Sequence, residues 1–432
     1  MIIPSPLQGL TRDGWLLFAT RFIRLFAYGS LSVVLVFYLI GIGLTEPQTG
    51  MLFTLTLVGD TVVSLVLTTR ADRMGRRRML MVGAVLMAAA GLVFASTTSL
   101  WLLVLAGTVG VISPSGHEVG PFLSIEQAAL SHLVTDQSRT KVFAWYTLAG
   151  SLATALGALT GGVATRLLQQ TAVDRVASYR GVVVLYACLG VVLAVLFSRL
   201  SRTAEATTLG EKNVFRATFA GLSGLDRSRD VVVKLSALFA LDSFGGGFVV
   251  QSFAAYWFYL RFGVNPATLG AIFFWANVFA GLSALLASRL ASRFGLIKTM
   301  VATHLPSNIL LILVPLMPTL PSAVAVLLVR FSISQMDVPT RQSYIMAVVS
   351  AEERSAAAGV TGVARTIGAA ISPLFVGLML ARPALINLPF FIAGTLKIAY
   401  DLLLYKQFVA VKPPEELGPS TLPSSLRKPF KS

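Results

Sequence analysis

The stretch TTRADRMGRRRML, residues 68–80, joins two long apolar runs and places five arginines around one aspartate. Arginines beside a membrane helix hold that end on the cytoplasmic side, and each is worth on the order of 1 kcal/mol near anionic headgroups. Gly75 suits a tight turn because glycine takes positive φ without a steric penalty. The stretch therefore predicts a short turn between two antiparallel membrane helices, which leaves Asp72 to be explained.

The composition indicates a polytopic membrane protein. Of the 432 residues, 55% are hydrophobic and 12% are charged, whereas a soluble domain carries about 25% charged residues. The net charge of +16 does not indicate nucleic-acid binding, because the basic residues cluster in alternate loops and none of these segments is interleaved with stacking aromatics. We expect membrane lipids and a small-molecule solute as partners, and no nucleic acid.

Apolar periodicity predicts an all-α membrane protein of twelve transmembrane helices in two pseudo-symmetric six-helix halves. We expect an N-terminal half at 1–200, a cytoplasmic central linker at 201–230, a C-terminal half at 231–410 and a cytoplasmic tail at 411–432. Most of the 35 lysines and arginines then lie on the side of the termini. The predicted helices are 14–41, 48–69, 78–97, 100–134, 141–165, 180–200, 230–260, 267–289, 297–317, 321–349, 355–381 and 384–408.

The two halves resemble each other in sequence. In a first repeat, RADRMGRRRML (70–80) recurs weakly as LASRFGLIKTM (290–300), so that Gly75 aligns with Gly295. In a second repeat, EQAALSHLVTDQSRTKV (126–142) is echoed by RQSYIMAVVSAEERSAA (341–357), so that Gln127 aligns with Gln342. Repeats on the same side of the membrane predict parallel halves related by an axis along the membrane normal.

This organisation resembles the major facilitator superfamily of secondary transporters. The family's loop motif runs Gly-x-x-x-Asp-Arg-x-Gly-Arg-Lys/Arg, and Thr68 replaces its leading glycine here. The positions that match are Asp72, Arg73, Gly75, Arg76 and Arg77. The resemblance implies that this loop is a conformational latch between the halves; the alternative is that its arginines only set the topology. It also implies a transporter that works by alternating access, and we expect a monomer.

Helix five carries GALTGG (157–162), which resembles an antiporter motif of the family with alanine in place of proline. Gly157, Gly161 and Gly162 form a small-residue face suited to close helix crossing. Plain packing and an antiport signature both remain open, so the motif gives a slight preference for export.

Ionisable side chains recur inside the predicted helices, although each costs about 2.5–3.5 kcal/mol at the centre of a membrane helix. Such residues face one another or a wet cavity, and the resemblance implies that helices one, four, seven and ten line that cavity. We predict a substrate and coupling site there. Its members are Arg24, Asp60, His117, Glu118, Asp242, Arg330, Asp337 and Arg341.

Helix four is predicted to be broken. Within VISPSGHEVGPFL (111–123), Pro114 and Pro121 remove backbone donors, and glycines relax the helix between them. His117 and Glu118 lie at this break, where exposed carbonyls are tolerated only beside protein or water. The alternative is a kinked structural helix in which these two residues pair with each other.

Three further groups of charges have alternative interpretations. Asp337 and Arg341 are four residues apart and form a substrate site or a structural ion network, with Arg330 on the same face. Asp60 is either the coupling acid, which would hold its proton without a partner, or a polar tie to Arg365 on helix eleven. On helix twelve, Lys397 and Asp401 are expected to satisfy each other as a local pair.

We expect a proton-coupled secondary transporter in a plasma or bacterial inner membrane, with no cofactor and no metal. The only histidines are His117, His132 and His304, and with the single Cys188 they assemble neither a metal site nor a nucleophile with its base. The substrate could be an organic anion, a zwitterion or an amphipathic cation. A non-transporting receptor on the same scaffold is the alternative function.

Overall fold

A computed structural model describes residues 7, 9–116, 118, 120–134, 136–205, 225, 228–350 and 353–411, except for the side chains of 72, 73, 136–140, 202, 288 and 355. Eleven helices in this part of the chain are long and apolar enough to cross a membrane, and Leu100–Val109 is a shorter apolar helix. The prediction of an all-α membrane protein is confirmed.

The first half contains α1 (Arg12–Gly41), α2 (Glu46–Met74), α3 (Arg76–Ser96), α4 (Leu100–Val109), α5 (Phe122–Leu133), α6 (Asp136–Gln170) and α7 (Arg175–Phe197). The second half contains α9 (Arg229–Gly247), α10 (Gln251–Phe262), α11 (Pro266–Phe294), α12 (Leu296–Leu313), α13 (Leu320–Ser334), α14 (Asp337–Val348), α15 (Arg354–Leu380) and α16 (Leu388–Phe408). Short 3₁₀ turns lie at η2 (Arg202–Ala204), η4 (Val314–Leu316) and η6 (Pro383–Leu385).

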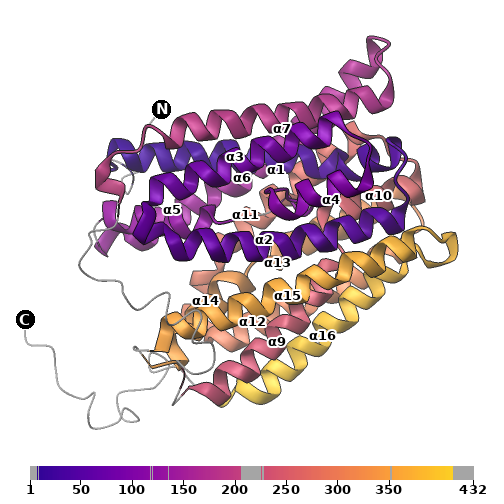
Figure 1. The fold of residues 1–432 in the computed structure, drawn as a ribbon. Helices are drawn as coiled ribbons and strands as arrows, with labels where there is room; N and C mark the ends of the chain where they lie inside the picture. The colour runs from indigo at the N-terminus through magenta and orange to yellow at the C-terminus, as the bar shows by residue number, and fades with distance from the viewer. Residues whose placement is uncertain are drawn as a thin grey trace, which may run out of the picture.

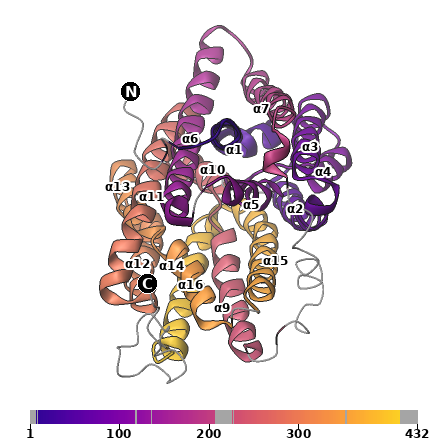
Figure 2. The same cartoon turned by 90° about the vertical axis from the view of Figure 1, so that its left-hand side faces the viewer.

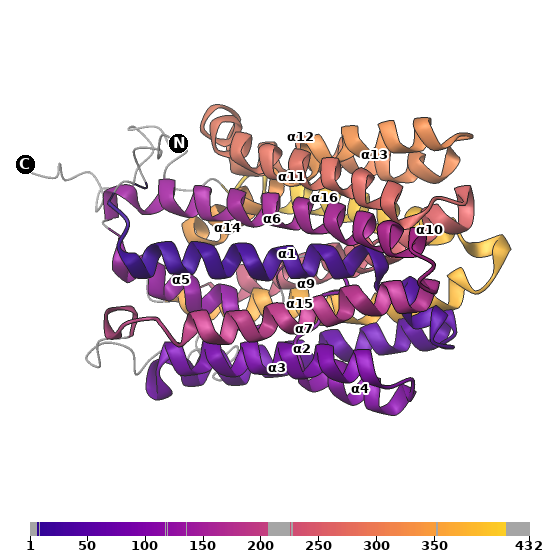
Figure 3. The same ribbon diagram turned by 90° about the horizontal axis from the view of Figure 1, so that it is seen from above.

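The helices run side by side along one axis, and α1 begins and α16 ends at the same end of the bundle (Figures 1 and 3). We call this the terminus end and the opposite one the far end. The first half lies in the upper part of Figure 1, and α9, α12 and α14–α16 lie in the lower part. Most of the predicted linker and tail, at 206–224 and 412–432, lies outside the described residues.

Three of the predicted helices are interrupted. The break in helix four, between α4 and α5, spans residues 110–121, where Gly116 and Gly120 have φ of +70° and +79°. The structure also separates α9 from α10 at 248–250 and α13 from α14 at 335–336, where we expected continuous helices. The first of these follows three consecutive glycines, and the second precedes Pro339, which has no backbone donor.

Gly75 forms the turn at the opening stretch, as expected. It has φ of +100° and separates α2 from α3, and Gly295, with φ of +88°, separates α11 from α12 in the same way. These two glycines are the pair that the first sequence repeat aligns. The same backbone turn is therefore built twice, once in each half.

Two glycine crossings join the halves near the far end. A Cβ on Gly50 of α2 would lie 3.0 Å from the Gly377 Cα of α15, and one on Gly162 of α6 would lie 3.1 Å from the Gly270 Cα of α11. The helix pairs α2–α15 and α6–α11 pack along each other (Figure 2). Gly50 and Gly270 are separated in sequence by the spacing of the first repeat, and Gly162 and Gly377 by that of the second. The two crossings are therefore equivalent positions of the repeated halves.

Hydrogen bonds between the two halves lie toward the same end of the bundle as the glycine crossings. The Gln251 amide donates to Ser32 Oγ at 2.7 Å, and the Tyr256 hydroxyl donates to the Glu46 carboxylate at 2.9 Å. The Ser252 backbone N–H donates to the Pro114 carbonyl in the break of helix four at 3.2 Å. These contacts and the glycine crossings close the space between the halves at the far end.

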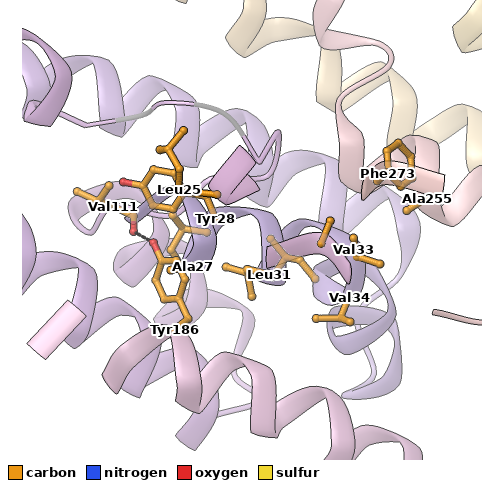
Figure 4. Close-up of a cluster of buried hydrophobic side chains, with 14 of the residues drawn as sticks. Leu25, Ala27, Tyr28, Leu31, Val33, Val34, Val111, Tyr186, Ala255 and Phe273 are labelled. Atoms are coloured by element: carbon orange, nitrogen blue, oxygen red, sulfur yellow. Dashed lines mark hydrogen bonds between the residues drawn. The ribbon is translucent and has the colours of Figure 1, made fainter. Parts of the chain in front are cut away.

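We expect Gly50→Ala to open the far end, because its methyl group would press against α15 and overpacking costs about 1–3 kcal/mol. The reporter is Ala255→Cys, fully buried on α10 (Figure 4), in a Cys188→Ser background. Its labelling by a water-soluble maleimide should accelerate by about 5- to 100-fold.

Gly362→Ala on α15 is the matched control, because a Cβ there meets nothing within 4 Å. Equal labelling rates in the two alanine variants would show that the glycine crossing does not hold the far end closed.

Candidate functional site

In the first half, Arg24 on α1 forms the centre of a buried ion cluster. Its side chain is fully buried and binds Glu126 on α5 through two parallel bonds, Nη1–Oε1 at 2.6 Å and Nη2–Oε2 at 2.7 Å. Its Nε donates to Glu118 Oε1 at 2.8 Å. The guanidinium is therefore held by one carboxylate inside the helix-four break and by another on the helix that follows it.

Other polar and aromatic groups complete this first cluster. Arg21 Nη1 lies 3.0 Å from Glu118 Oε2, and the Tyr146 hydroxyl of α6 donates to Glu126 Oε2 at 2.5 Å. The Arg24 guanidinium stacks 4.6 Å above the centre of the Phe122 ring. With two arginines and two glutamates the cluster is electrically balanced, which offsets the cost of burying its charges.

The break that places Glu118 is held by aromatic side chains from neighbouring helices. The Tyr186 hydroxyl of α7 donates to the Val111 carbonyl, which has no helical partner (Figure 4). The Tyr28 ring of α1 stacks on Tyr186 with centroids 6.2 Å apart. The Tyr186 hydroxyl thus satisfies a backbone carbonyl in the break, where no helical N–H is available.

Asp60 on α2 is buried and lies apart from the ion pairs. Its Oδ1 has no hydrogen-bond partner in the described part of the chain, and the Gly120 backbone N–H donates to its carboxylate. We considered a tie to Arg365, but no ion pair or hydrogen bond joins these two described side chains; the buried Nε of Arg365 is also without a partner. That alternative is therefore not supported by the geometry.

In the second half, Asp242 on α9 is the centre of a larger cluster. Its Oδ1 accepts from Lys397 Nζ of α16 at 2.6 Å, and its Oδ2 accepts from Arg341 Nη1 of α14 at 3.1 Å. The same Arg341 nitrogen lies 3.3 Å from Asp337 Oδ2, one helical turn earlier. Arg341 thus bridges two carboxylates, as the spacing of four residues allowed.

This second cluster extends to the helices α12 and α16. His304 Nδ1 lies 2.8 Å from Asp401 Oδ1, and the Asn308 amide donates to Asp401 Oδ2 at 2.9 Å. The other ring nitrogen of His304 is 3.8 Å from Asp242 Oδ1. The expectation that Lys397 and Asp401 pair with each other is wrong, because each has a closer partner on another helix.

Arg330 lies near this cluster without an ion pair to any described residue. We predicted a network of Arg330, Asp337 and Arg341, but only the last two are within 4.0 Å of each other. The buried Nε of Arg330 has no partner among the described residues, and its guanidinium lies 5.0 Å from the centre of the Phe331 ring. Residues on one helix face need not touch when the helix breaks between them, as it does here at 335–336.

The two clusters are related by the repeat with the charges exchanged. Arg24 corresponds to Asp242 at nearly the spacing of the first repeat, and their partners Glu126 and Arg341 each begin one copy of the second repeat. In the first half the cation is on the first helix and the acid on the fourth, whereas in the second half the signs are reversed. We missed Glu126, although it aligns with Arg341; this alignment was the signal that could have found it.

The structure does not describe every residue that we predicted. His117 lies outside the described residues, and so do the side chains of Asp72 and Arg73 in the latch loop. The rest of that loop binds the segment after α7: the Arg76 and Arg77 backbone N–H groups donate to the Glu205 carboxylate at 2.6 and 3.3 Å. Glu205 thereby caps the N-terminus of α3.

The glycines of helix five lie at helix crossings. Cβ atoms on Gly157 and Gly161 would lie 2.9 Å from Ser30 backbone atoms of α1, and Gly162 faces α11. All three positions therefore let two backbones approach closely. Within the described residues no group of three or more His, Cys, Asp or Glu is placed to hold a metal ion.

Comparisons with known proteins place this arrangement in a family. The profile of the Major Facilitator Superfamily matches residues 17–373 and 235–432. An uncharacterized membrane protein of Saccharomyces cerevisiae is 32% identical over 426 residues, which cover 93% of this chain and 95% of that protein.

Solved structures share the fold at low sequence identity. The nucleoside transporter NupG has a TM-score of 0.72 and 13% identity, covering 92% of this chain and all of that one. A D-xylose-proton symporter has a TM-score of 0.70 and 17% identity, covering 93% and 98%. An inward-facing, occupied bacterial homolog of the human lysosomal transporter Spinster has a TM-score of 0.66 and 16% identity, covering 91% and 94%.

We expect Glu126→Gln to destabilise the protein by about 3–5 kcal/mol, because the change leaves the buried Arg24 guanidinium without its closest counter-charge. The melting temperature of the detergent-purified protein measures this. The double variant Arg24→Gln/Glu126→Gln should be more stable than the sum of the single effects predicts. Asp230→Asn, on the exposed first turn of α9, is the control. Additive losses would mean that the pair is not coupled.

A second cycle separates the partners of Lys397. We expect Lys397→Met and Asp242→Asn to be coupled by about 0.5–3 kcal/mol, since their charged atoms are in contact. Lys397→Met and Asp401→Asn should be closer to additive in the same melting measurement. Stronger coupling in the second combination would restore the local pair on α16 that we expected from the spacing.

Proposed function

The chain belongs to the Major Facilitator Superfamily and is a secondary transporter rather than an enzyme, and we propose that it moves a small solute in a proton-coupled cycle. The solute binds between the two ion clusters, and the halves rock about it so that each side of the membrane gains access in turn. The described state, closed at the far end, is one of the two end states of this cycle.

The clusters support this proposal because each of them includes residues at or near an interruption of a membrane helix. Glu118 is inside the break of helix four, Asp337 is the first residue of α14, and Asp242 lies one turn before the end of α9. Interrupted membrane helices present backbone carbonyls and helix ends to a solute, which continuous helices cannot do. We assign the solute and coupling site to these residues together with Arg24 and Arg341.

The isolation of the Asp60 carboxylate is the observation that supports proton coupling. Glu118, Glu126, Asp242 and Asp337 each contact a cation, whereas Asp60 is buried without a cationic partner among the described residues. An ionised carboxylate in such a place is costly, and a protonated one is much less so. We therefore propose Asp60 as the group that gains and loses the transported proton, at the edge of the helix-four break.

The latch role of the loop at 68–80 is part of the proposal. Gly75 makes the turn, and the Glu205 carboxylate holds the first backbone groups of α3, so the loop is tied to the segment that leads toward the second half. We place both termini in the cytoplasm on the strength of the loop arginines. We keep a monomer in a plasma or bacterial inner membrane as the working assumption.

Export has no support beyond the sequence motif of helix five. Its glycines lie at crossings with α1 and α11, a role that suits either direction of transport. A non-transporting receptor is not favoured, because the solved structures that share this fold are named as transporters. A measurement of flux separates the two functions directly.

We expect solute-driven proton movement in vesicles that contain the purified protein and a trapped pH-sensitive dye. Adding small anionic, zwitterionic, cationic and neutral solutes in turn should give a pH change with one class. Asp60→Asn should abolish the pH change while solute exchange between the two sides continues, because only the proton site is lost. Asp174→Asn, an exposed helix cap at the far end, should behave as the wild type.

Proton movement that survives in Asp60→Asn would remove this residue from the coupling step. Solute flux with no pH change in the wild type would exclude proton coupling altogether.

A further inference from the structure

Three guanidinium groups of the second half have unused hydrogen-bonding capacity. The Nε atoms of Arg330, Arg341 and Arg365 are buried and have no hydrogen-bond partner in the described part of the chain. Arg341 uses its Nη1 on two aspartates, but no described carboxylate lies within 4.0 Å of Arg330 or Arg365. Leaving such donors unpaired is costly, and this cost is removed when a ligand supplies the acceptors.

The three arginines converge on one region. Asp242 and Asp337, which Arg341 bridges, also act electrostatically on both Arg330 and Arg365. Arg341 in turn is the largest electrostatic influence on Arg365. The groups come from three successive elements, α13, α14 and α15. Arg341 has two aspartate partners, whereas Arg330 and Arg365 have no carboxylate partner among the described residues, so an anion bound beside them would supply the missing counter-charge.

The net charge of the second cluster also favours the binding of an anion. The first cluster is balanced, since two arginines face two glutamates. In the second, cations outnumber carboxylates by one when His304 is neutral, and by two when it is protonated. The described cations are Arg330, Arg341, Arg365 and Lys397, and the described carboxylates are Asp242, Asp337 and Asp401.

The residue type indicates which anions fit. A guanidinium presents parallel N–H groups that match the two oxygens of a carboxylate or the oxygens of a phosphate, a geometry that lysine lacks. Lys397, the lysine among the described cations of the cluster, is already bound to Asp242 at 2.6 Å. A cationic solute would add to the positive excess, so the arrangement disfavours it.

We propose that Arg330, Arg341 and Arg365 form an anion-binding site and that the transported solute carries a carboxylate or phosphate group. This inference rests on the proposed function, because it takes the second ion cluster to be part of the solute site. It selects the organic anion among the three substrate classes that the sequence leaves open. Arg365, which the sequence suggested only as a tie to Asp60, becomes a solute contact.

The test is the melting temperature of the purified full-length protein with defined probes at constant ionic strength. The probes are succinate and citrate for carboxylates, inorganic phosphate and glycerol 3-phosphate for phosphates, choline for cations and glucose for neutral solutes. We expect one anion class, at about ten times its dissociation constant, to raise the melting temperature by about 2–6 °C. The class that acts distinguishes carboxylate from phosphate.

Substitutions of the arginines test where the anion binds. Arg365→Gln and Arg330→Gln should each reduce the anion-induced shift at least twofold, whereas Arg382→Gln, at an exposed arginine in the turn before η6, should leave it unchanged. Arg365→Lys and Arg330→Lys keep the positive charge but lose the parallel N–H groups of the guanidinium. They provide the same comparison if a glutamine variant does not fold. They should show a partial shift.

The inference is overturned if no anion stabilises the wild type, or if the shift persists unchanged in the Arg330 and Arg365 variants. These outcomes are separate from failure of the proposed function. Anions that bind without any solute flux would contradict transport but keep the anion site. A neutral or cationic solute that drives proton flux, with no anion binding, would keep transport and remove the anion site.

Discussion

The ion pair between Arg24 and Glu126 is the constraint on which the rest of the first half depends. A charged side chain in the membrane must find its counter-charge inside the protein, because removing one partner of such a pair costs about 3–5 kcal/mol. Here the two parallel bonds join α1 to α5 and so fix the helix that follows the break at 110–121. The break in turn places Glu118, which contacts both Arg24 and Arg21.

The second half also pairs its buried charges inside the protein, but the signs are exchanged and more residues take part. Asp242 takes the place of Arg24, and Arg341 takes the place of Glu126. This cluster also includes His304 on α12 and Asp401 on α16. A symmetric backbone therefore carries an asymmetric charge distribution: one half is balanced, and the other has a positive excess. In the proposed cycle, this difference would favour one orientation of a bound solute between the two halves.

The helix crossings between the two halves also follow the sequence repeat, but they are made by glycines and not by ion pairs. Glycines at 50 and 162 meet glycines at 377 and 270, so backbones approach where side chains would separate them. These crossings contain no charged side chain, whereas the ion pairs of the two clusters each lie within one half. The distribution suits a molecule whose halves must move apart at one end without breaking their internal ion pairs.

The sequence by itself determined the membrane class, the turn at Gly75, the break at Pro114–Pro121 and several of the charged residues that the structure gathers in the two ion clusters, because hydropathy, glycine and proline act locally. Only the tertiary structure decided the partners. Lys397 is four residues from Asp401 yet binds Asp242, and Arg330 shares a helical period with Asp337 yet lies apart from it. Spacing along one helix gives the possible contacts of a charge; which contact forms depends on neighbouring helices that bury it, and their positions follow from packing across the whole chain.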